Sequence, residues 1–268
     1  MAKDLRSLAR RMLENGPVKT LPASQRVRAL FNGTYIADTT SACYVWEHQY
    51  YPEFYIPARD VKEGVLTQVE AIEGPSGSGS ASMMKLKVTG GSFGRKDKET
   101  DAVIQFKSPW SDGNPVVRFD FGRMDGWLEE DTPIYVHPKD PFKRVDLLAS
   151  TRKIDIKLDN QLVASSSSAI HLLETGLPTR YYLPLTSVVD PAMLQPSSLR
   201  TKCPYKGEAE YYNVVLRGAD GVAENLVWYY TRPTVECEGI AGQICFYNEK
   251  VDVYVDGVLQ PRPKTQFG

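Results

Sequence analysis

The sequence predicts a mainly β protein made of two tandem small antiparallel β domains, with a short N-terminal helix. Three observations carry this prediction: an internal repeat, short segments that alternate with period two, and turn residues at the ends of those segments. Val27–Pro57 aligns without a gap on Ile154–Pro184, an offset of 127 residues (154 − 27 = 127). A unit of about a hundred residues is long enough to bury its own core. We therefore expect two similar domains, each a curved sheet or half-barrel.

The N-terminal segment, residues 1–25, is predicted to hold the helix. Leu5, Leu8 and Met12 recur at helical spacing, and Gly16 follows as a stop signal. We interpret this segment as a packing helix, with an arginine-rich targeting helix as the alternative. The chain opens without an apolar secretory region, so we expect a cytoplasmic protein.

The two repeats, residues 26–128 and 152–268, are predicted to be strands joined by tight turns. Val251–Val255, for example, ends at Asp256-Gly257. Asp-Gly supplies the positive φ angles that hairpin turns need. The apolar and polar residues alternate along most such segments, as they do in strands with one buried face.

The register of the repeat is predicted to hold to its end. With the same offset of 127 residues, Phe119 falls on Phe246 and Trp127 falls on Tyr254. These aromatic matches lie far beyond the first aligned stretch. They indicate that one unit has been duplicated as a whole.

Two connecting segments differ in character. Glu73–Ser82 is rich in Gly and Ser, which predicts a flexible, exposed loop. Residues 129–151 instead mix three prolines with apolar residues such as Ile134 and Phe142, which is too apolar for a free tether. We expect this linker to pack along both domains and to fix their relation.

The composition excludes several classes of partner and cofactor. A net charge of −1 argues against nucleic acid and membrane surfaces as partners, because both usually require a basic face. Four cysteines without a Cys-x-x-Cys pair and only three histidines predict no metal site. No dinucleotide, haem or P-loop signature is present, so we expect no cofactor. The sequence leaves a homodimer open.

Several stretches of the second repeat carry a family resemblance. They are Glu174–Pro184, Thr201–Ala209, Trp228–Tyr230 and Ile240–Asp252. With these stretches, the second repeat resembles the family known as domain of unknown function 427, also filed under a nucleotidyltransferase-type name. Trp127–Asp131 together with Val136–Pro141 is similar to the tandem, two-copy members. The resemblance implies a small β-rich domain, often doubled, and leaves the activity open.

The two copies differ at one place that points to chemistry. The second copy carries Cys203-Pro204-Tyr205-Lys206-Gly207 where the first carries the loop Pro75–Gly79. A lysine ammonium near a thiol favours the thiolate, so Cys203 is a candidate nucleophile. Lys206 is a candidate acid–base group or anchor for an anion. In the alternative reading the segment is a turn with a buried thiol and a surface charge.

Carboxylate and arginine residues complete the candidate chemistry. Glu174 follows an apolar strand pattern, and Glu47 is its counterpart in the first copy. We expect Glu174 to be partly buried with a raised pKa, as a general acid or base requires; its alternative role is to hold Arg180 or a backbone amide. Arg180 is a candidate substrate anchor, and a structural Arg–Glu pair is its alternative.

The remaining candidate substrate-binding residues are mostly aromatic. Because side chains alternate along a strand, only about half of them can line one cavity. A histidine in the linker, a candidate proton shuttle that is more simply a structural group, completes the set. The candidates are Tyr181, Tyr205, Trp228, Tyr229, Tyr247 and His137, together with Glu47 of the first copy.

These residues together predict a cofactor-independent enzyme of small-molecule metabolism that uses acid–base chemistry. Isomerisation, cyclisation, dehydration and hydrolysis all fit an aromatic-lined pocket with Glu174, Lys206 and Cys203 as catalytic groups. One alternative is a small-ligand-binding or scaffold protein without turnover. Another is a nucleotidyltransferase-like activity. The expected partner is a small organic molecule.

Overall fold

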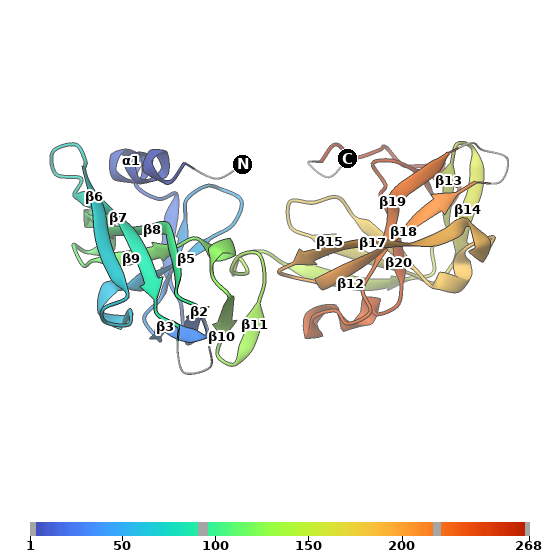
Figure 1. The fold of residues 1–268 in the computed structure, drawn as a ribbon. Helices are drawn as coiled ribbons and strands as arrows, with labels where there is room; N and C mark the ends of the chain where they lie inside the picture. Colours follow the sequence, from blue (N-terminus) through green and yellow to red (C-terminus); the bar gives the residue numbers. More distant parts are fainter. Residues whose placement is uncertain (1–3, 91–95, 217–220, 266–268) are drawn as a thin grey trace. The chain divides into compact units, whose positions relative to one another are not determined.

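The computed structural model describes residues 4–90, 96–216 and 221–265, and the chain forms two compact units (Figure 1). The first unit is Met1–Asp140 and the second is Pro141–Gly268. Both are mainly β with antiparallel pairing, so the predicted fold class is confirmed. Within the described ranges, no helix has both the length and the apolar character needed to cross a membrane.

The first unit consists of a larger and a smaller antiparallel sheet, with one α-helix. Its elements are α1 (Leu5–Asn15), β1 (Lys19–Pro22), β2 (Val27–Phe31), β3 (Thr34–Thr39), β4 (Cys43–Trp46), β5 (Glu53–Pro57), η1 (Ala58–Asp60), β6 (Leu66–Glu73), β7 (Ser80–Val88), β8 (Lys98–Lys107), η2 (Pro109–Ser111), β9 (Val116–Phe119), η3 (Phe121–Arg123), β10 (Gly126–Glu129) and β11 (Thr132–Ile134). Among the described residues the larger sheet has the order β1-β4-β5-β9-β8-β7-β6, and the smaller sheet has the order β11-β10-β2-β3.

The second unit repeats this arrangement strand for strand. Its elements are β12 (Val145–Ser150), β13 (Ile154–Leu158), β14 (Gln161–Ser166), β15 (Ala169–Glu174), β16 (Arg180–Leu183), η4 (Leu185–Ser187), η5 (Pro191–Met193), β17 (Leu194–Cys203), β18 (Gly207–Val215), β19 (Val222–Tyr229), η6 (Val235–Ile240), β20 (Ile244–Phe246), β21 (Asp252–Val255) and β22 (Val258–Leu259). In the described part of this unit, the larger sheet runs β12-β15-β16-β20-β19-β18-β17 and the smaller runs β14-β13-β21-β22.

The larger sheet of each unit has a buried cluster on each of its faces. In the first unit one face belongs to a core that includes Phe31, Phe54 and Trp127. The other face packs against α1, whose buried Leu8 and Met12 join a separate cluster. Figure 1 shows α1 over β7 and β8. The predicted N-terminal helix is therefore present, and it packs on the sheet.

The repeat holds in register through most of the unit and slips by one residue near its end. Arg118 pairs with Tyr55 and Cys245 pairs with Tyr182, so these positions keep the offset of 127 (245 − 118 = 127). Trp127 pairs with Ala29, but Ile156, which corresponds to Ala29, pairs with Val253.

Trp127 therefore corresponds to Val253, and the predicted match of Trp127 with Tyr254 is wrong. The physical reason is the two-residue period of a strand, which sends neighbouring side chains to opposite faces. Trp127 and Val253 are both buried in the cores between the sheets. Tyr254 is only half-buried and carries the ammonium of Lys157 over its ring. One residue fewer in the second copy keeps the apolar side chain inside.

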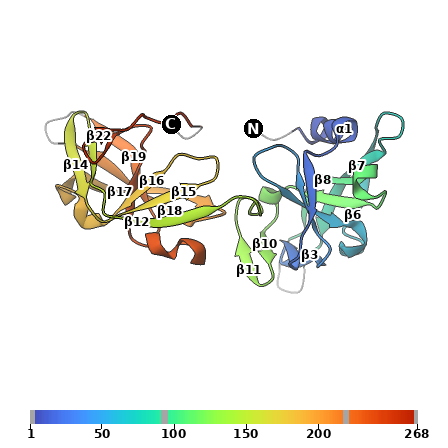
Figure 2. The ribbon, with the colours of Figure 1, turned by 180° about the vertical axis from the view of Figure 1, so that it is seen from behind.

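Residues 129–151, predicted as one linker, contribute a strand to each unit. β11 extends the smaller sheet of the first unit, and β12 begins the larger sheet of the second. The boundary between the units falls between Asp140 and Pro141. Both views of the fold show β10 and β11 side by side as a hairpin (Figure 2).

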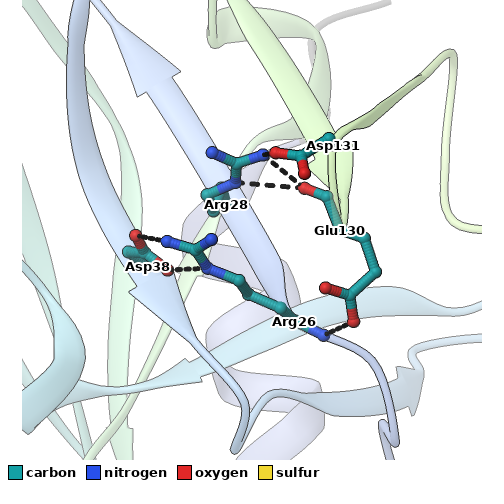
Figure 3. A network of polar contacts seen from close by, with 5 residues as sticks. All are labelled: Arg26, Arg28, Asp38, Glu130 and Asp131. Carbon is teal, nitrogen blue, oxygen red and sulfur yellow. Dashed lines mark hydrogen bonds and ion pairs between the residues drawn. The ribbon is translucent and has the colours of Figure 1, made fainter.

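An arginine network ties the β10–β11 hairpin to β2 (Figure 3). Arg28 donates through Nε to the backbone oxygen of Glu130 at 3.1 Å and pairs with Asp131. The backbone N–H of Arg26 donates to the Glu130 carboxylate at 2.8 Å. The guanidinium of Arg26 pairs with Asp38 at 2.5 Å. Buried Arg28 thus donates to the Glu130 carbonyl in the turn between β10 and β11.

The loop between β6 and β7, predicted to be flexible, has a specific hydrogen-bonded shape. Gly74 N donates to Gly79 O at 3.1 Å, and Ser108 Oγ donates to Ser78 O at 2.8 Å. Gly79 has a φ of 90°, and a Cβ built on it would collide with the carbonyl oxygen of Lys107. Glycine is therefore required at this position on two grounds, conformation and space.

We expect Gly79→Ala to destabilise the first unit by about 2–4 kcal/mol, because it adds an overlap with backbone to an unfavourable φ. Gly77→Ala is the matched control, since Gly77 has a φ of 83° with nothing within 4 Å of a built Cβ. The control should cost only about 1–2 kcal/mol. Chemical denaturation of both variants measures the difference. Equal losses for the two variants would contradict the close approach of Gly79 to the Lys107 backbone.

Candidate functional site

A cluster of thiols and aromatic rings covers one face of the larger sheet in the second unit. We call it the thiol–aromatic cluster; its buried members are Leu172, Tyr182, Ala209, Tyr211, Trp228, Tyr230, Cys237, Ile240 and Cys245. β16, β18, β19 and β20 supply most of these side chains, and η6 supplies Cys237 and Ile240. The opposite face of the same sheet belongs to the core between the two sheets. The predicted site residues on these strands therefore lie on one face of the sheet or on the other.

Two lysines share one glutamate at the edge of this cluster. Lys206 Nζ lies 2.5 Å from Oε2 of Glu174, and Lys143 Nζ lies 2.9 Å from Oε1. The Glu174 side chain is 5% exposed, that of Lys206 12% and that of Lys143 19%. We call these three residues the lysine–glutamate centre. It places two positive charges against one negative charge in a mostly desolvated position.

The turn that carries Lys206 is fixed by the segment leading into η6. Thr234 N donates to the Lys206 carbonyl at 3.2 Å, and Thr234 Oγ1 donates to the Tyr205 carbonyl at 2.6 Å. Gly207, which follows Lys206, has a φ of 99° that other residues rarely adopt. These contacts fix the backbone position of Lys206.

The pKa of Glu174 is lowered, and the expectation of a raised pKa is wrong. Burial by itself raises this pKa, as the sequence reasoning assumed, but the charges and hydrogen bonds of Lys206 and Lys143 outweigh burial. The second lysine precedes β12 and was not foreseen. Glu174 is therefore a carboxylate at neutral pH and serves as a counter-ion in this structure.

Lys206 remains an ammonium, and Cys203 lies close enough to influence it. Burial lowers the pKa of Lys206, but the charges of Cys203 and Glu174 raise it more, so the net pKa is above the ordinary value. Cys203 is half-buried, and the nearby Cys237 is buried with a pKa raised by desolvation. The structure thus brings the three predicted catalytic residues, Glu174, Lys206 and Cys203, into one neighbourhood.

Arg180 lies in a separate ion pair. Its guanidinium makes two bonds of 2.6 Å to the carboxylate of Glu249 and also contacts Asn248. The guanidinium lies 5.4 Å from the ring centre of Trp228. Although burial raises the pKa of Glu249, hydrogen bonds from Arg180 and Thr265 lower it to about 2. Arg180 therefore pairs with Glu249, and the alternative of a Glu174–Arg180 pair does not occur.

Three of the predicted aromatic residues lie with the thiol–aromatic cluster. Trp228 Nε1 donates to the hydroxyl of buried Tyr182 at 2.9 Å, and the Tyr247 ring lies 4.5 Å from the Trp228 ring. Tyr205 is buried, and Lys143 Nζ lies 5.2 Å from its ring centre. Tyr205, Trp228 and Tyr247 are thus the aromatic neighbours of the charged residues described above.

Tyr181 and Tyr229 point to the opposite face of the sheet. Tyr229 stacks on Tyr212 at 4.7 Å, and its hydroxyl donates to Glu210 at 3.2 Å. Tyr181 meets the ring of His171 edge-on at 4.9 Å. Both pack against the core between the sheets, because they alternate with Tyr182 and Trp228 along their strands. The alternation was anticipated, but the sequence did not say which members belonged together.

The first unit holds a different ionic network at the corresponding place. Arg118 is 1% exposed and lies 2.8 Å from Glu47, 3.7 Å from Glu53 and 3.2 Å from Asp120. The Tyr55 hydroxyl donates to Glu47 at 3.3 Å. By register Arg118 corresponds to Cys245, and by the 127-residue offset Glu53 corresponds to Arg180 and Glu47 to Glu174. The same framework thus places Arg118 beside Glu47 in the first copy, and Lys143 and Lys206 beside Glu174 in the second.

His137, the last predicted binding residue, lies in the first unit. Its ring stacks on Tyr51 with centres 4.1 Å apart, and Nδ1 lies 2.7 Å from the Pro138 carbonyl oxygen. Nearby, the indole N–H of Trp46 donates to Asp140 at 3.1 Å. These contacts dock the segment after β11 onto its own unit, which is a structural role.

A comparison with known families matches residues 19–130 and 146–257 to the family described as Domain of unknown function (DUF427). The chain belongs to this family. Its two DUF427 copies start in β1 and β12 and keep the 127-residue offset (146 − 19 = 127), which confirms the predicted tandem membership. Searching curated proteins finds no match to the chain.

Sequence reasoning missed three residues that complete the charged groups of the second DUF427 copy: Lys143, Asn248 and Glu249. Lys143 sits in the segment predicted as a linker, where nothing in the pattern marks it as a partner of Glu174. Glu249 and Asn248 follow β20 in a turn. Their position inside the matched stretch Ile240–Asp252 was the available signal, but it assigns no role.

Proposed function

We propose that the second DUF427 copy is a cofactor-independent enzyme domain that handles a small organic anion or carbonyl compound at the lysine–glutamate centre. The single observation behind this proposal is that Lys143 and Lys206 share one carboxylate, Glu174, in a mostly desolvated position. Two ammonium groups against one carboxylate leave one positive charge to be balanced. A bound carboxylate, or an oxyanion that develops during reaction, would balance it.

The roles of the residues follow from their charges. Lys206 and Lys143 would stabilise negative charge on the substrate, and Glu174 would hold both ammonium groups in place. Cys203 is the adjacent group able to exchange a proton or to act as a nucleophile. Tyr205, whose ring centre lies 5.2 Å from Lys143 Nζ, and Trp228 of the thiol–aromatic cluster are the candidates for contact with an apolar substrate body. When the reacting group is a carbonyl, isomerisation, cyclisation, dehydration and hydrolysis each have a route through such an oxyanion.

Binding without turnover is the second candidate, and one observation favours it. Because the pKa of Glu174 is lowered and that of Lys206 is raised, neither group has a pKa near neutral pH. Efficient proton transfer is favoured when the pKa of the acid or base lies near the working pH. A domain that only holds an anion has no such requirement.

The test is ligand binding and turnover by full-length Lys206→Gln, with Lys153→Ala as the matched lysine control. Lys153 is in the same unit, is 57% exposed and lies 3.9 Å from Asp155. With benzoate and inorganic phosphate as probes, we expect the wild type and the control to gain thermal stability. Lys206→Gln should lose at least about 1.4 kcal/mol of binding, a tenfold weaker affinity. Glutamine keeps a hydrogen-bond donor to Glu174, which favours folding of the variant.

Turnover separates the two candidate functions. The protein is incubated with a mixture of small carboxylates and carbonyl compounds, and products are followed by mass spectrometry. Product formed by the wild type and lost in Lys206→Gln supports the enzyme. Binding without product supports the non-catalytic alternative. Equal binding by Lys206→Gln and the wild type would remove the site from consideration.

A further inference from the structure

The second unit contains a polar depression that is distinct from the lysine–glutamate centre. It has a volume of about 760 Å³ and opens on β17, β18 and β19. Its polar lining residues are Ser197, Ser198, Arg200, Asn213, Glu224 and Asn225. Ligand sites of small organic molecules commonly fall between about 300 and 1,000 Å³. We propose that this depression binds a neutral polyhydroxy compound, a sugar or cyclic polyol.

The depression is formed where β17 and β19 bulge on either side of β18. β17 pairs regularly with β18 at Pro196 and again at Arg200, so residues 197–199 bulge from the ladder. β18 and β19 pair at Tyr212–Val227 and again at Val214–Ala223, so Asn213 faces residues 224–226. Bulges redirect side chains and are frequent beside functional sites. Here they turn polar side chains of all three strands toward one hollow.

The first unit serves as an internal comparison, because its corresponding strands bulge less. β6 and β7 skip only Val69 between the pairs Gln68–Met84 and Glu70–Met83. In β8 two residues, 101–102, face one residue of β7, whereas in β19 three face one residue of β18. The two copies share a framework, so the enlarged bulges are specific to the second copy.

Side-chain hydrogen bonds fix the polar groups of the depression. Ser197 Oγ donates to Asn225 Oδ1 at 2.5 Å, and Asn225 N donates to Asn213 Oδ1 at 2.7 Å. Asn225 has a φ of 52°, a left-handed conformation that costs free energy for a residue other than glycine. Since the Oδ1 atoms of both asparagines are used within the protein, their Nδ2 groups are the ones left to donate to a ligand.

The charges of the lining favour a neutral ligand. Arg200 lies 2.9 Å from Glu210 and also donates to the carbonyl oxygens of Ser197 and Leu199, so its charge is already balanced. Glu224 is exposed and supplies an acceptor. Hydroxyl groups both donate and accept, so adjacent hydroxyls of a sugar match amide donors that lie beside a carboxylate and serine hydroxyls. The lining contains no aromatic residue, which disfavours a planar heterocycle as ligand.

The test is an NMR titration of the ¹⁵N-labelled full chain with methyl α-D-glucopyranoside, methyl α-D-mannopyranoside and myo-inositol. We expect at least one probe to bind with a Kd of about 1–10 mM and to shift the Asn213 and Asn225 signals. Asn225→Gly removes the side chain but suits the positive φ, so the backbone should be retained. This variant should weaken binding at least about fivefold. Ser198→Ala, which removes only an exposed lining hydroxyl, should weaken it about two- to fivefold.

Asn160→Gly is the matched control, because Asn160 has a φ of 63° in the β13–β14 turn of the same unit and does not line the depression. It should bind the probe as the wild type does. The proposal is overturned if no probe shifts the depression at about 100 mM, a concentration well above the expected Kd. It is also overturned if Asn225→Gly and Ser198→Ala both bind as Asn160→Gly does, or if benzoate alone shifts the same signals. None of these outcomes bears on Lys206, so the proposed function is tested separately.

Discussion

Replacing Arg118 by methionine should destabilise the first unit by about 3–5 kcal/mol, because breaking a buried ion pair leaves an uncompensated charge. Arg118 is 1% exposed, and the side chains of Glu47 and Glu53 beside it are 1% and 7% exposed. Methionine is apolar and leaves both carboxylates without their guanidinium. Hydrogen exchange followed by mass spectrometry localises the loss, which should appear in β4, β5 and β9 and leave the second unit unchanged.

Two controls separate charge from packing in this experiment. Arg59→Met removes an arginine that is 71% exposed and lies 3.7 Å from Asp60, so it should cost less than about 1 kcal/mol. Adding Glu47→Gln and Glu53→Gln to Arg118→Met should restore part of the stability, because neutral amides then replace the two buried carboxylates that lost the guanidinium. A loss for Arg118→Met no larger than that for Arg59→Met would show that the buried network contributes little.

The fold was predictable because the repeat and the strand pattern are local and redundant. The alignment of Val27–Pro57 with Ile154–Pro184 required no gap, and the strands it implied are present in both units. The error at Trp127 arose because an ungapped offset cannot sense a one-residue deletion in a turn. Only the pairing of Ala29 and Ile156 with their partners reveals it. Burial of one strand face decides such a register, and burial is a property of the packed sheet.

The candidate site was predictable in its members but not in its pairings. Glu174, Lys206 and Cys203 lie close together, in the copy where Lys206 and Cys203 stand in place of Gly and Ser of the first copy. The partner that decides the charge of the centre, Lys143, lies 31 residues before Glu174 (174 − 143 = 31) in a segment with no pattern of its own. Contacts between residues this far apart depend on sheet order, which periodicity does not encode.

The polar depression likewise depends on contacts between strands that the sequence does not predict. Asn213 lies in β18 and Asn225 in β19, and the alternation of residues along these segments does not mark the bulges. The left-handed φ of Asn225 and its bonds to neighbouring strands exist only once three strands are side by side. Asparagine tolerates this conformation better than most residues, which was the one local signal.

Replacing Glu249 by glutamine should lower the stability of the second unit by about 3 kcal/mol at neutral pH. The pKa of Glu249 falls from its ordinary 4.5 to about 2, mainly through the hydrogen bonds from Arg180 and Thr265, which outweigh burial. A lowered folded-state pKa stabilises the protein above the unfolded-state value and loses this contribution as pH falls toward 2. A difference of about 2.5 pKa units corresponds to about 3 kcal/mol.

The pH dependence distinguishes this charge effect from lost packing. In the wild type, the contribution of Glu249 should disappear between about pH 4.5 and 2, whereas the glutamine amide that replaces this carboxyl group does not titrate. The difference in the free energy of unfolding between the two proteins should therefore decrease as the pH falls. Urea denaturation at several pH values, with Glu208→Gln as a control, measures it. Glu208 is 53% exposed and lies 3.8 Å from Lys202, so its replacement should change little.

A constant difference from pH 7 to pH 2 would instead mean that glutamine disturbs the contacts of Arg180 with Trp228 and Asn248 by its shape alone. Arg180→Met combined with Glu249→Gln tests that reading, because it removes both charges from the partly buried pair. If the ion pair is responsible, the double variant should be more stable than Glu249→Gln, which leaves the guanidinium unbalanced among apolar rings. The first unit needs no such pair, since Glu53 occupies the position of Arg180 and is held by Arg118 from the neighbouring β9.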